Sequence, residues 1–172
     1  RPVSVYDAGC VLGPRINAGS RSDKGELGAT LLSTEDAEEA RNIAWTLNDC
    51  NDKRKDIQAE MLDHAISLVE REDMSGQDIL IVGHEDWHPG LSGLVAGKLK
   101  EKYGKPAVAI TYTTNEKGQR EGRGSGRSVP GINLGGAFMA AEKEGLLIKG
   151  GGHAMAAGFS VMPEKVDDLI AF

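Results

Sequence analysis

The sequence predicts an α/β fold in which a long connector helix leads into a small mixed β-sheet domain with flanking helices. Two observations predict it. Apolar residues keep helical spacing from about residue 34 to residue 75. Beyond that point short aliphatic segments alternate with amphipathic ones, and a strand, helix, strand order implies parallel pairing through a right-handed crossover.

Residues 1–33 are rich in glycine, serine and charge, and they lack sustained periodicity. Such a segment is typical of loops and short elements. We expect it to be the end of a larger domain, most of which is absent from this chain.

The connector helix is predicted over residues 34–75. Thr34, followed by Glu35 and Asp36, is the expected N-cap, because acidic residues favour the first turn. The helix's apolar positions run from residue 40 to the end at residue 75, about 36 residues or on the order of 55 Å of helix. Its apolar stripe is thin and residues 51–55 are polar, so it cannot all lie on one small core. We therefore interpret it as a link between two domains.

Residues 76–172 are predicted to form the sheet domain. Strands are expected where apolar residues run together, and helices where they recur with helical spacing. Pro163 suits the first turn of a last helix. The expected strands are residues 79–82, 107–111 and 156–161, and the expected helices are residues 91–103 and 132–144.

The composition, with 40% hydrophobic and 27% charged residues, is that of a soluble globular chain. No apolar run approaches the roughly 20 residues that span a bilayer, and the first residues lack the apolar segment of a secretion signal. We therefore expect a cytoplasmic protein that does not bind membranes. The formal net charge of −6 repels nucleic acid, so any DNA contact must come from a local basic patch. Cys10 and Cys50 lack a CxxC partner and are expected to be plain reduced thiols.

Residues 84–88, HEDWH, match the HExxH pattern of zinc enzymes. Zinc binding requires both histidines on one face of a helix. Here the motif follows a predicted strand and runs into Pro89 and Gly90, which disfavours helix. No third ligand is apparent, so we expect no metal and no cofactor in this chain.

Residues 122–128, GRGSGRS, combine glycines with two arginines and two hydroxyls. Glycine lets a backbone approach a ligand closely, and guanidinium forks and hydroxyls suit phosphate oxygens. Arg123, Ser125, Arg127 and Ser128 are therefore candidate phosphate ligands. The alternative interpretation is a flexible basic loop.

Residues 149–158, KGGGHAMAAG, also suit an anion. Consecutive glycines, among them Gly151 and Gly152, offer free backbone N–H donors, and His153 adds a side chain whose charge responds near neutral pH. The alternative is a purely structural histidine.

Residues 13–21, GPRINAGSR, place Arg15 and Arg21 around the amide of Asn17 in a glycine-containing loop. Such a loop could track a nucleic-acid backbone. Taken alone, the segment favours the simpler interpretation, a solvated turn.

Together these stretches resemble the RecJ family of the DHH phosphoesterase superfamily, across nearly the whole chain and in the family's order. The last block is the signature of the DHH-associated domain and is shared in shorter form by other DHH enzymes and by alanyl-tRNA synthetases. The full set is far more specific to RecJ. The matching blocks are GPRINA at 13–18, WHPG at 87–90 with KPAV at 105–108, GSGRS at 124–128, and GGHAMAAG at 151–158.

One departure concerns Arg21. The family usually has alanine, alanine, glycine and arginine where this chain has Ala18, Gly19, Ser20 and Arg21. The expected pose of Arg21 is therefore the least defined among the candidates.

In the RecJ family a first domain holds divalent metals, manganese or magnesium, with an Asp-His-His motif and further aspartates, and it hydrolyses single-stranded DNA from the 5′ end. The only Asp-His pair here, Asp63 with His64, is followed by Ala65 and is expected to be ordinary helix surface. The resemblance therefore implies a fragment that is inactive alone and holds no catalytic residue. Residues 1–33 would be the tail of the metal-binding domain, 34–75 the connector helix, and 76–172 the DHH-associated, substrate-binding domain.

The resemblance also implies partners and a site. The partners are single-stranded DNA and the metal-binding DHH domain of the same parent chain, in DNA repair and recombination. The site residues would hold the DNA phosphate at the scissile position, facing the metals across a cleft. They are Arg15, Asn17, Arg21, His88, Arg123, Ser125, Arg127, Ser128, Gly151, Gly152 and His153.

Two other functions stay open at this point. The first is a stand-alone module that binds nucleic acid or a nucleotide, and a genuine start codon just before Arg1 would favour it. An Asp-His-His block upstream in the parent gene would favour the exonuclease instead. The second is part of a small-molecule DHH phosphatase or a tRNA-editing relative, which does not predict the blocks at 87–90 and 13–18 together.

Overall fold

The computed structural model describes residues 2–19, 24–115 and 117–172. The chain divides into two compact units, Arg1–Ala59 and Glu60–Phe172, and the division falls inside one long helix. Arg21, one of the residues expected to bind phosphate, lies outside the described residues.

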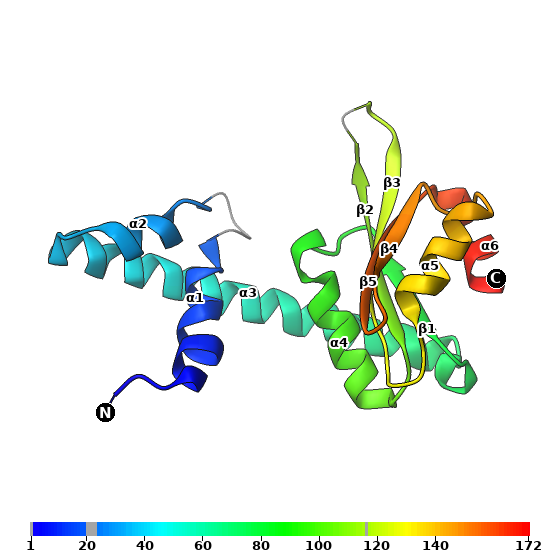
Figure 1. The fold of residues 1–172 in the computed structure, drawn as a ribbon, viewed down its shortest axis with the longest axis horizontal. Helices are drawn as coiled ribbons and strands as arrows, with labels where there is room; N and C mark the ends of the chain where they lie inside the picture. Colours follow the sequence, from blue (N-terminus) through cyan, green and yellow to red (C-terminus); the bar gives the residue numbers. More distant parts are fainter. Residues whose placement is uncertain (1, 20–23, 116) are drawn as a thin grey trace. The chain divides into compact units, whose positions relative to one another are not determined.

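The first unit contains short helices and the first part of the long helix (Figure 1). A π-helical segment at Asp7–Leu12 runs into α1 at Gly13–Ile16, and α2 follows at Leu27–Ser33. The expectation of a loop at residues 13–21 was wrong for residues 13–16, which form α1. Pro14 lies in the first turn, where its fixed φ suits a helix and its missing N–H costs nothing.

The long helix, α3, spans Ala37–Arg71. Asp36, and not Thr34, caps it, because the Asp36 carboxylate accepts from the N–H groups of Glu38 at 2.8 Å and Glu39 at 3.2 Å. The Thr34 hydroxyl accepts from the Asp36 N–H instead. After α3 the backbone of Asp73 adopts a left-handed conformation and a 3-10 turn follows at Met74–Gly76.

The second unit is built on a five-stranded mixed sheet with strand order β1-β2-β3-β5-β4. Only β1 and β2 are parallel, and α4 at Ser92–Tyr103 connects them. The predicted fold class, a long helix followed by a small mixed sheet with flanking helices, is confirmed. The strands are β1 Leu80–His84, β2 Ala107–Thr114, β3 Arg120–Arg127, β4 Lys149–His153 and β5 Ala156–Val161.

Two of these strands, β3 and β4, are rich in glycine and were not among the strands expected from the sequence. Glycine is normally depleted in strands. In β3 the missing side chains make room for neighbours, since a Cβ at Gly124 would lie 2.2 Å from the Phe159 ring and one at Gly126 would lie 2.4 Å from Leu134. The glycines of β3 therefore reflect close packing and not a flexible loop.

Helices cover both faces of the sheet (Figure 1). On one face α4 and the end of α3 pack on Leu80, Val82, Ala107 and Ala109. On the other face lie α5 at Leu134–Lys143 and α6 at Val166–Ala171, which pack on alternate strand residues. Those residues are Ile81, Val108, Ile110, Ala157, Phe159 and Val161. Among the described residues, every helix is too short or too polar to cross a bilayer.

Candidate functional site

The register of β3, β5 and β4 arranges the candidate residues of the second unit in three rows. Gly124 and Gly126 face Phe159 and Leu134 on the α5 side, so the alternate residues Arg123, Ser125 and Arg127 project toward the α4 side. The rows, read from β3 to β4, are Arg127, Ala156 and His153; Ser125, Gly158 and Gly151; and Arg123, Ser160 and Lys149.

A hollow of about 770 Å³ opens beside two of these rows. Its walls come from the segment that leads into α4, from β3, and from the hairpin of β4 and β5. Most of the lining residues are small or cationic. They are Pro89, Gly90, Ser92, Arg123, Gly124, Ser125, Lys149, Gly150, Gly151, Gly152, Gly158, Phe159 and Ser160.

Arg127 lies in the row next to the hollow and is half-buried. Its Nη1 donates to the carbonyl of Gly126 at 2.8 Å. Its Nη2 lies against the first turn of α4, where a Cβ at Gly93 would come within 2.8 Å of it. A guanidinium has five N–H donors, so this arrangement fixes the side chain and leaves donors for an anion.

Two serine hydroxyls meet at the wall between α4 and β3. Ser92 Oγ lies 3.1 Å from Ser125 Oγ and 3.0 Å from the carbonyl oxygen of Pro89. A hydroxyl has one proton and can accept as well. Because a carbonyl can only accept, Ser92 donates its one proton to Pro89 and accepts from Ser125, which fixes the Ser125 hydroxyl at the wall of the hollow.

His88 precedes the 3-10 turn Pro89–Leu91, whose N-terminal end it caps. Its Nδ1 accepts from the N–H of Gly90 at 3.1 Å. In the neutral ring the proton therefore resides on Nε2, which is the nitrogen that remains able to donate.

The two remaining candidates near the hairpin differ in exposure. Ser128 is buried, and its hydroxyl donates to the carbonyl of Ile132 at 2.9 Å while its N–H donates to Met155 at 3.0 Å. These contacts fasten the end of β3 to its neighbours. His153 is exposed and ends β4, directly before the turn into β5.

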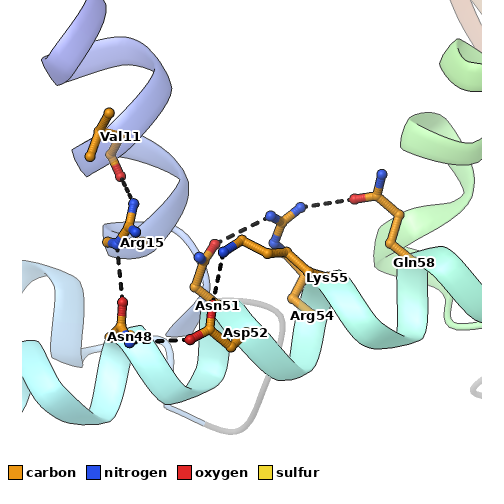
Figure 2. A network of polar contacts seen from close by, with 8 residues as sticks. All are labelled: Val11, Arg15, Asn48, Asn51, Asp52, Arg54, Lys55 and Gln58. Carbon is orange, nitrogen blue, oxygen red and sulfur yellow. Dashed lines mark hydrogen bonds and ion pairs between the residues drawn. The ribbon is translucent and has the colours of Figure 1, made fainter.

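Arg15 belongs to the first unit, where a polar network holds it (Figure 2). Its Nε donates to Asn48 Oδ1 at 3.1 Å and its Nη1 donates to the carbonyl of Val11 at 2.7 Å. Asn48 in turn donates to Asp52 at 3.2 Å, and Lys55 lies 2.8 Å from the same carboxyl group. The hydrogen bond from Lys55, with the charges of Lys55 and Arg15, lowers the pKa of Asp52 below its ordinary value.

The Arg15 network thus fixes the guanidinium through its Nε and Nη1 atoms (Figure 2). Asn17 ends α1 and is exposed, with its N–H donating to the carbonyl of Gly13 at 2.9 Å. Arg15 and Asn17 belong to the first unit, and the other described candidates belong to the second.

Replacing Asn48 with alanine is expected to loosen Arg15 without unfolding the chain. The lost hydrogen bond, worth about 0.5–1.5 kcal/mol, should make exchange of the Arg15 Nε proton with solvent roughly 2- to 10-fold faster. NMR exchange measurements on the Arg15 Nε–H would record this. Asn42→Ala, an exposed change on the same helix, is the control, and equal rates in both variants would contradict the orienting role of Asn48.

His64 was expected to be ordinary helix surface, and this was wrong. It is half-buried, and its Nδ1 accepts from Trp87 Nε1 at 3.3 Å. Its ring lies edge-on to that of His84, with centroids 4.5 Å apart. A buried tryptophan needs a partner for its N–H, which explains the position of His64.

The HExxH match is not helical, as expected. His84 ends β1 and His88 precedes a 3-10 turn, so the two rings do not share a helix face. Within residues 2–19, 24–115 and 117–172 there is no group of three or more His, Cys, Asp or Glu side chains that could hold a metal ion. The described residues therefore do not fit the metals that the resemblance implies for the full enzyme.

Several residues of the hollow were absent from the sequence-based site. Lys149 opens the glycine run, which was the one available signal for it. Ser92 and Ser160 carry no local signal, because only the register and the placement of α4 bring them to the hollow. Glu121 lies just beyond, and a hydrogen bond from Ser160, followed by one from Asn115 and the charge of Arg123, lowers its pKa.

The fold and the site define an α/β domain with an open, glycine-rich and basic sheet face. The family model described as the DHHA1 domain matches residues 76–172, more than half of the chain. The chain belongs to the DHHA1 domain family.

More narrowly, the chain is similar to RecJ proteins. It is 37% identical over 169 residues to the single-stranded-DNA-specific exonuclease RecJ of Dickeya dadantii, covering 95% of this chain and 28% of that protein. With RecJ of Bacillus subtilis the identity is 35% over 161 residues, covering 94% of this chain and 20% of that protein. The chain thus spans less than a third of the length of these relatives.

Solved structures agree with this similarity. The crystal structure of RecJ in complex with Mn²⁺ from Thermus thermophilus matches with a TM-score of 0.81 and 29% identity, over 96% of this chain and 23% of that one. A crystal structure of exonuclease RecJ bound to manganese matches with a TM-score of 0.79 and 27% identity, over 98% of this chain and 40% of that one. The resemblance to the RecJ family expected from the sequence is confirmed.

Proposed function

We propose that this chain is the substrate-binding part of a single-stranded-DNA-specific exonuclease. In this proposal it positions DNA phosphates for metal-dependent phosphodiester hydrolysis by a metal-binding DHH domain of the same parent chain. The observation that carries it is the alignment of Arg127, Ser125 and Arg123 along one side of β3, beside the hollow. The similarity to RecJ supplies the substrate class.

The chemistry of the face supports a phosphodiester ligand. Guanidinium forks bind phosphate oxygens through charge-assisted hydrogen bonds, and glycines let the ligand approach the backbone closely. In β4, Gly151 and Gly152 line the hollow next to the hydroxyl of Ser125. β4 is an edge strand, which leaves alternate N–H groups unpaired by the sheet.

The residues of this chain bind and orient in the proposed reaction, and they perform no bond cleavage. RecJ structures contain Mn²⁺ or Mg²⁺, and such ions would activate water and neutralise charge on the phosphate in the DHH domain. Roles in DNA repair and recombination, and a cytoplasmic location, belong to the same proposal and rest on the resemblance to RecJ.

The test of the proposed function is the affinity for single-stranded DNA of the chain and of Arg127→Ala. We expect weak binding by the wild type, roughly 10⁻⁴ to 10⁻⁶ M, because few cations act within a chain of net charge −6. Losing a charge-assisted contact worth about 1.5–3 kcal/mol should weaken binding roughly 10- to 100-fold. Fluorescence anisotropy with a labelled oligonucleotide at two salt concentrations would measure this.

Arg120→Ala is the matched control for the charge that is lost. Arg120 starts the same strand, is exposed, and pairs with Glu85 away from the hollow. A solvated Arg127 with no ligand would make the two variants equal, and that outcome would refute the proposed role.

A further inference from the structure

The hollow has a second cationic row, in which Arg123 lies beside Lys149, a residue absent from the sequence-based site. Arg123 on β3 and Lys149 on β4 both pair in register with Ser160 on β5, and all three line the hollow. The two cations are exposed. Among the described residues no hydrogen bond or ion pair holds the Lys149 ammonium group, so it is available to a ligand.

The Arg123 guanidinium is held by an ion pair on its Nε side only. Its Nε lies 3.8 Å from Glu121 Oε1, and the Glu121 side chain is only 12% exposed. This ion pair uses Nε, and the two Nη groups are not part of it. The carboxylate therefore fixes the direction of the guanidinium and leaves its outer fork for an anion.

The second row is too far from the first to share one phosphate group. Arg123 and Arg127 are four residues apart on β3, which at roughly 3.4 Å per residue gives about 14 Å. The row between them holds only Ser125, Gly158 and Gly151, whose small side chains leave the surface open. Phosphates two nucleotides apart on one strand fit the two rows, with the intervening sugars and phosphate over the small residues.

We propose that Arg123 and Lys149 form a second phosphate subsite, which takes a phosphate further along the same strand than the one at Arg127. This inference rests on the proposed function and deepens it. The two rows together make the chain prefer an oligonucleotide to a mononucleotide. Arg123 gives a planar fork and Lys149 a mobile point charge, a combination suited to a backbone phosphate whatever the base.

The test compares Lys149→Ala with Lys143→Ala in the full 172-residue chain. Lys143 ends α5, is exposed, and lies in the helix that covers the opposite sheet face. With a long single-stranded thymidylate oligonucleotide we expect Lys149→Ala to weaken binding several-fold. The slope of log K against log salt should fall by about 0.7, the value for one phosphate contact to a single strand. Lys143→Ala should leave both quantities near the wild type.

Thymidine 5′-monophosphate is the second probe, and its binding would be monitored through changes in the backbone NMR chemical shifts of the chain. A single phosphate cannot reach both rows. The mononucleotide should therefore cause the same chemical-shift changes at Arg127 and its neighbours in Lys149→Ala as in the wild type, at every concentration. The inference is overturned if Lys149→Ala and Lys143→Ala bind the oligonucleotide alike while Arg127→Ala weakens it. If Arg127→Ala also binds as the wild type does, the proposed function itself has failed.

Discussion

Replacing Gly152 with alanine is expected to destabilise the second unit by several kcal/mol. Gly152 has a φ of +140°, a region in which a side chain costs on the order of 1–3 kcal/mol. A Cβ there would also lie 2.7 Å from Ala157 Cα and 2.8 Å from the Ala156 carbonyl oxygen. These are backbone atoms of the paired strand, so the clash cannot be relieved by a rotamer change.

Thermal unfolding followed by circular dichroism would measure the loss. At about 4–8 °C per kcal/mol for a domain of this size, Gly152→Ala should lower Tm by on the order of 10 °C or more. Gly97→Ala is the control, because Gly97 lies in α4 with nothing within 4 Å of a new Cβ. Alanine there should be neutral or stabilise by up to about 1 kcal/mol. Equal Tm values for the two variants would show that β4 does not need glycine at this position.

The elements that the sequence predicted are those with an apolar pattern of their own. The strand at 156–161 has the same limits in the structure, and α4 begins one residue later than expected. β3 and β4 were not predicted, because their strand conformation depends on neighbouring residues from other parts of the sequence. Phe159 and Leu134 occupy the space that side chains of β3 would fill, and no local pattern in β3 reveals those neighbours.

The candidate site likewise contains residues that local sequence predicted and residues that only the tertiary structure brings in. The glycine and arginine chemistry of residues 122–128 pointed to Arg123, Ser125 and Arg127, and alternation along β3 gives all three one side of the strand. Lys149 and Ser160 reach Arg123 only through the register of three strands, which is a tertiary property. His64 was misjudged for a related reason, since its contact with Trp87 joins residues that are far apart in the sequence.

The last prediction concerns Trp87, which fastens the segment that leads into the hollow. The side chain is 4% exposed, packs in the core with Leu91, and donates to His64. Removing a buried tryptophan side chain typically costs about 3–5 kcal/mol, so Trp87→Ala should lower Tm more than any surface change. Trp87→Phe keeps most of the volume but loses the N–H donor, and it should fall between the wild type and Trp87→Ala.

The chain provides its own control, since it has only two tryptophans and the other, Trp45 on α3, is 66% exposed. Trp45→Ala should change stability by no more than about 0.5 kcal/mol, as surface substitutions usually do. Each variant also leaves one emitter, so Trp45→Ala should show blue-shifted fluorescence from buried Trp87 and Trp87→Ala the red-shifted emission of an exposed ring. Because Pro89, Gly90 and Ser92 follow Trp87 directly and line the hollow, the loss should also weaken binding of single-stranded DNA at temperatures where Trp87→Ala remains folded. Similar Tm values for Trp87→Ala and Trp45→Ala would mean that the segment before α4 is not held by its tryptophan.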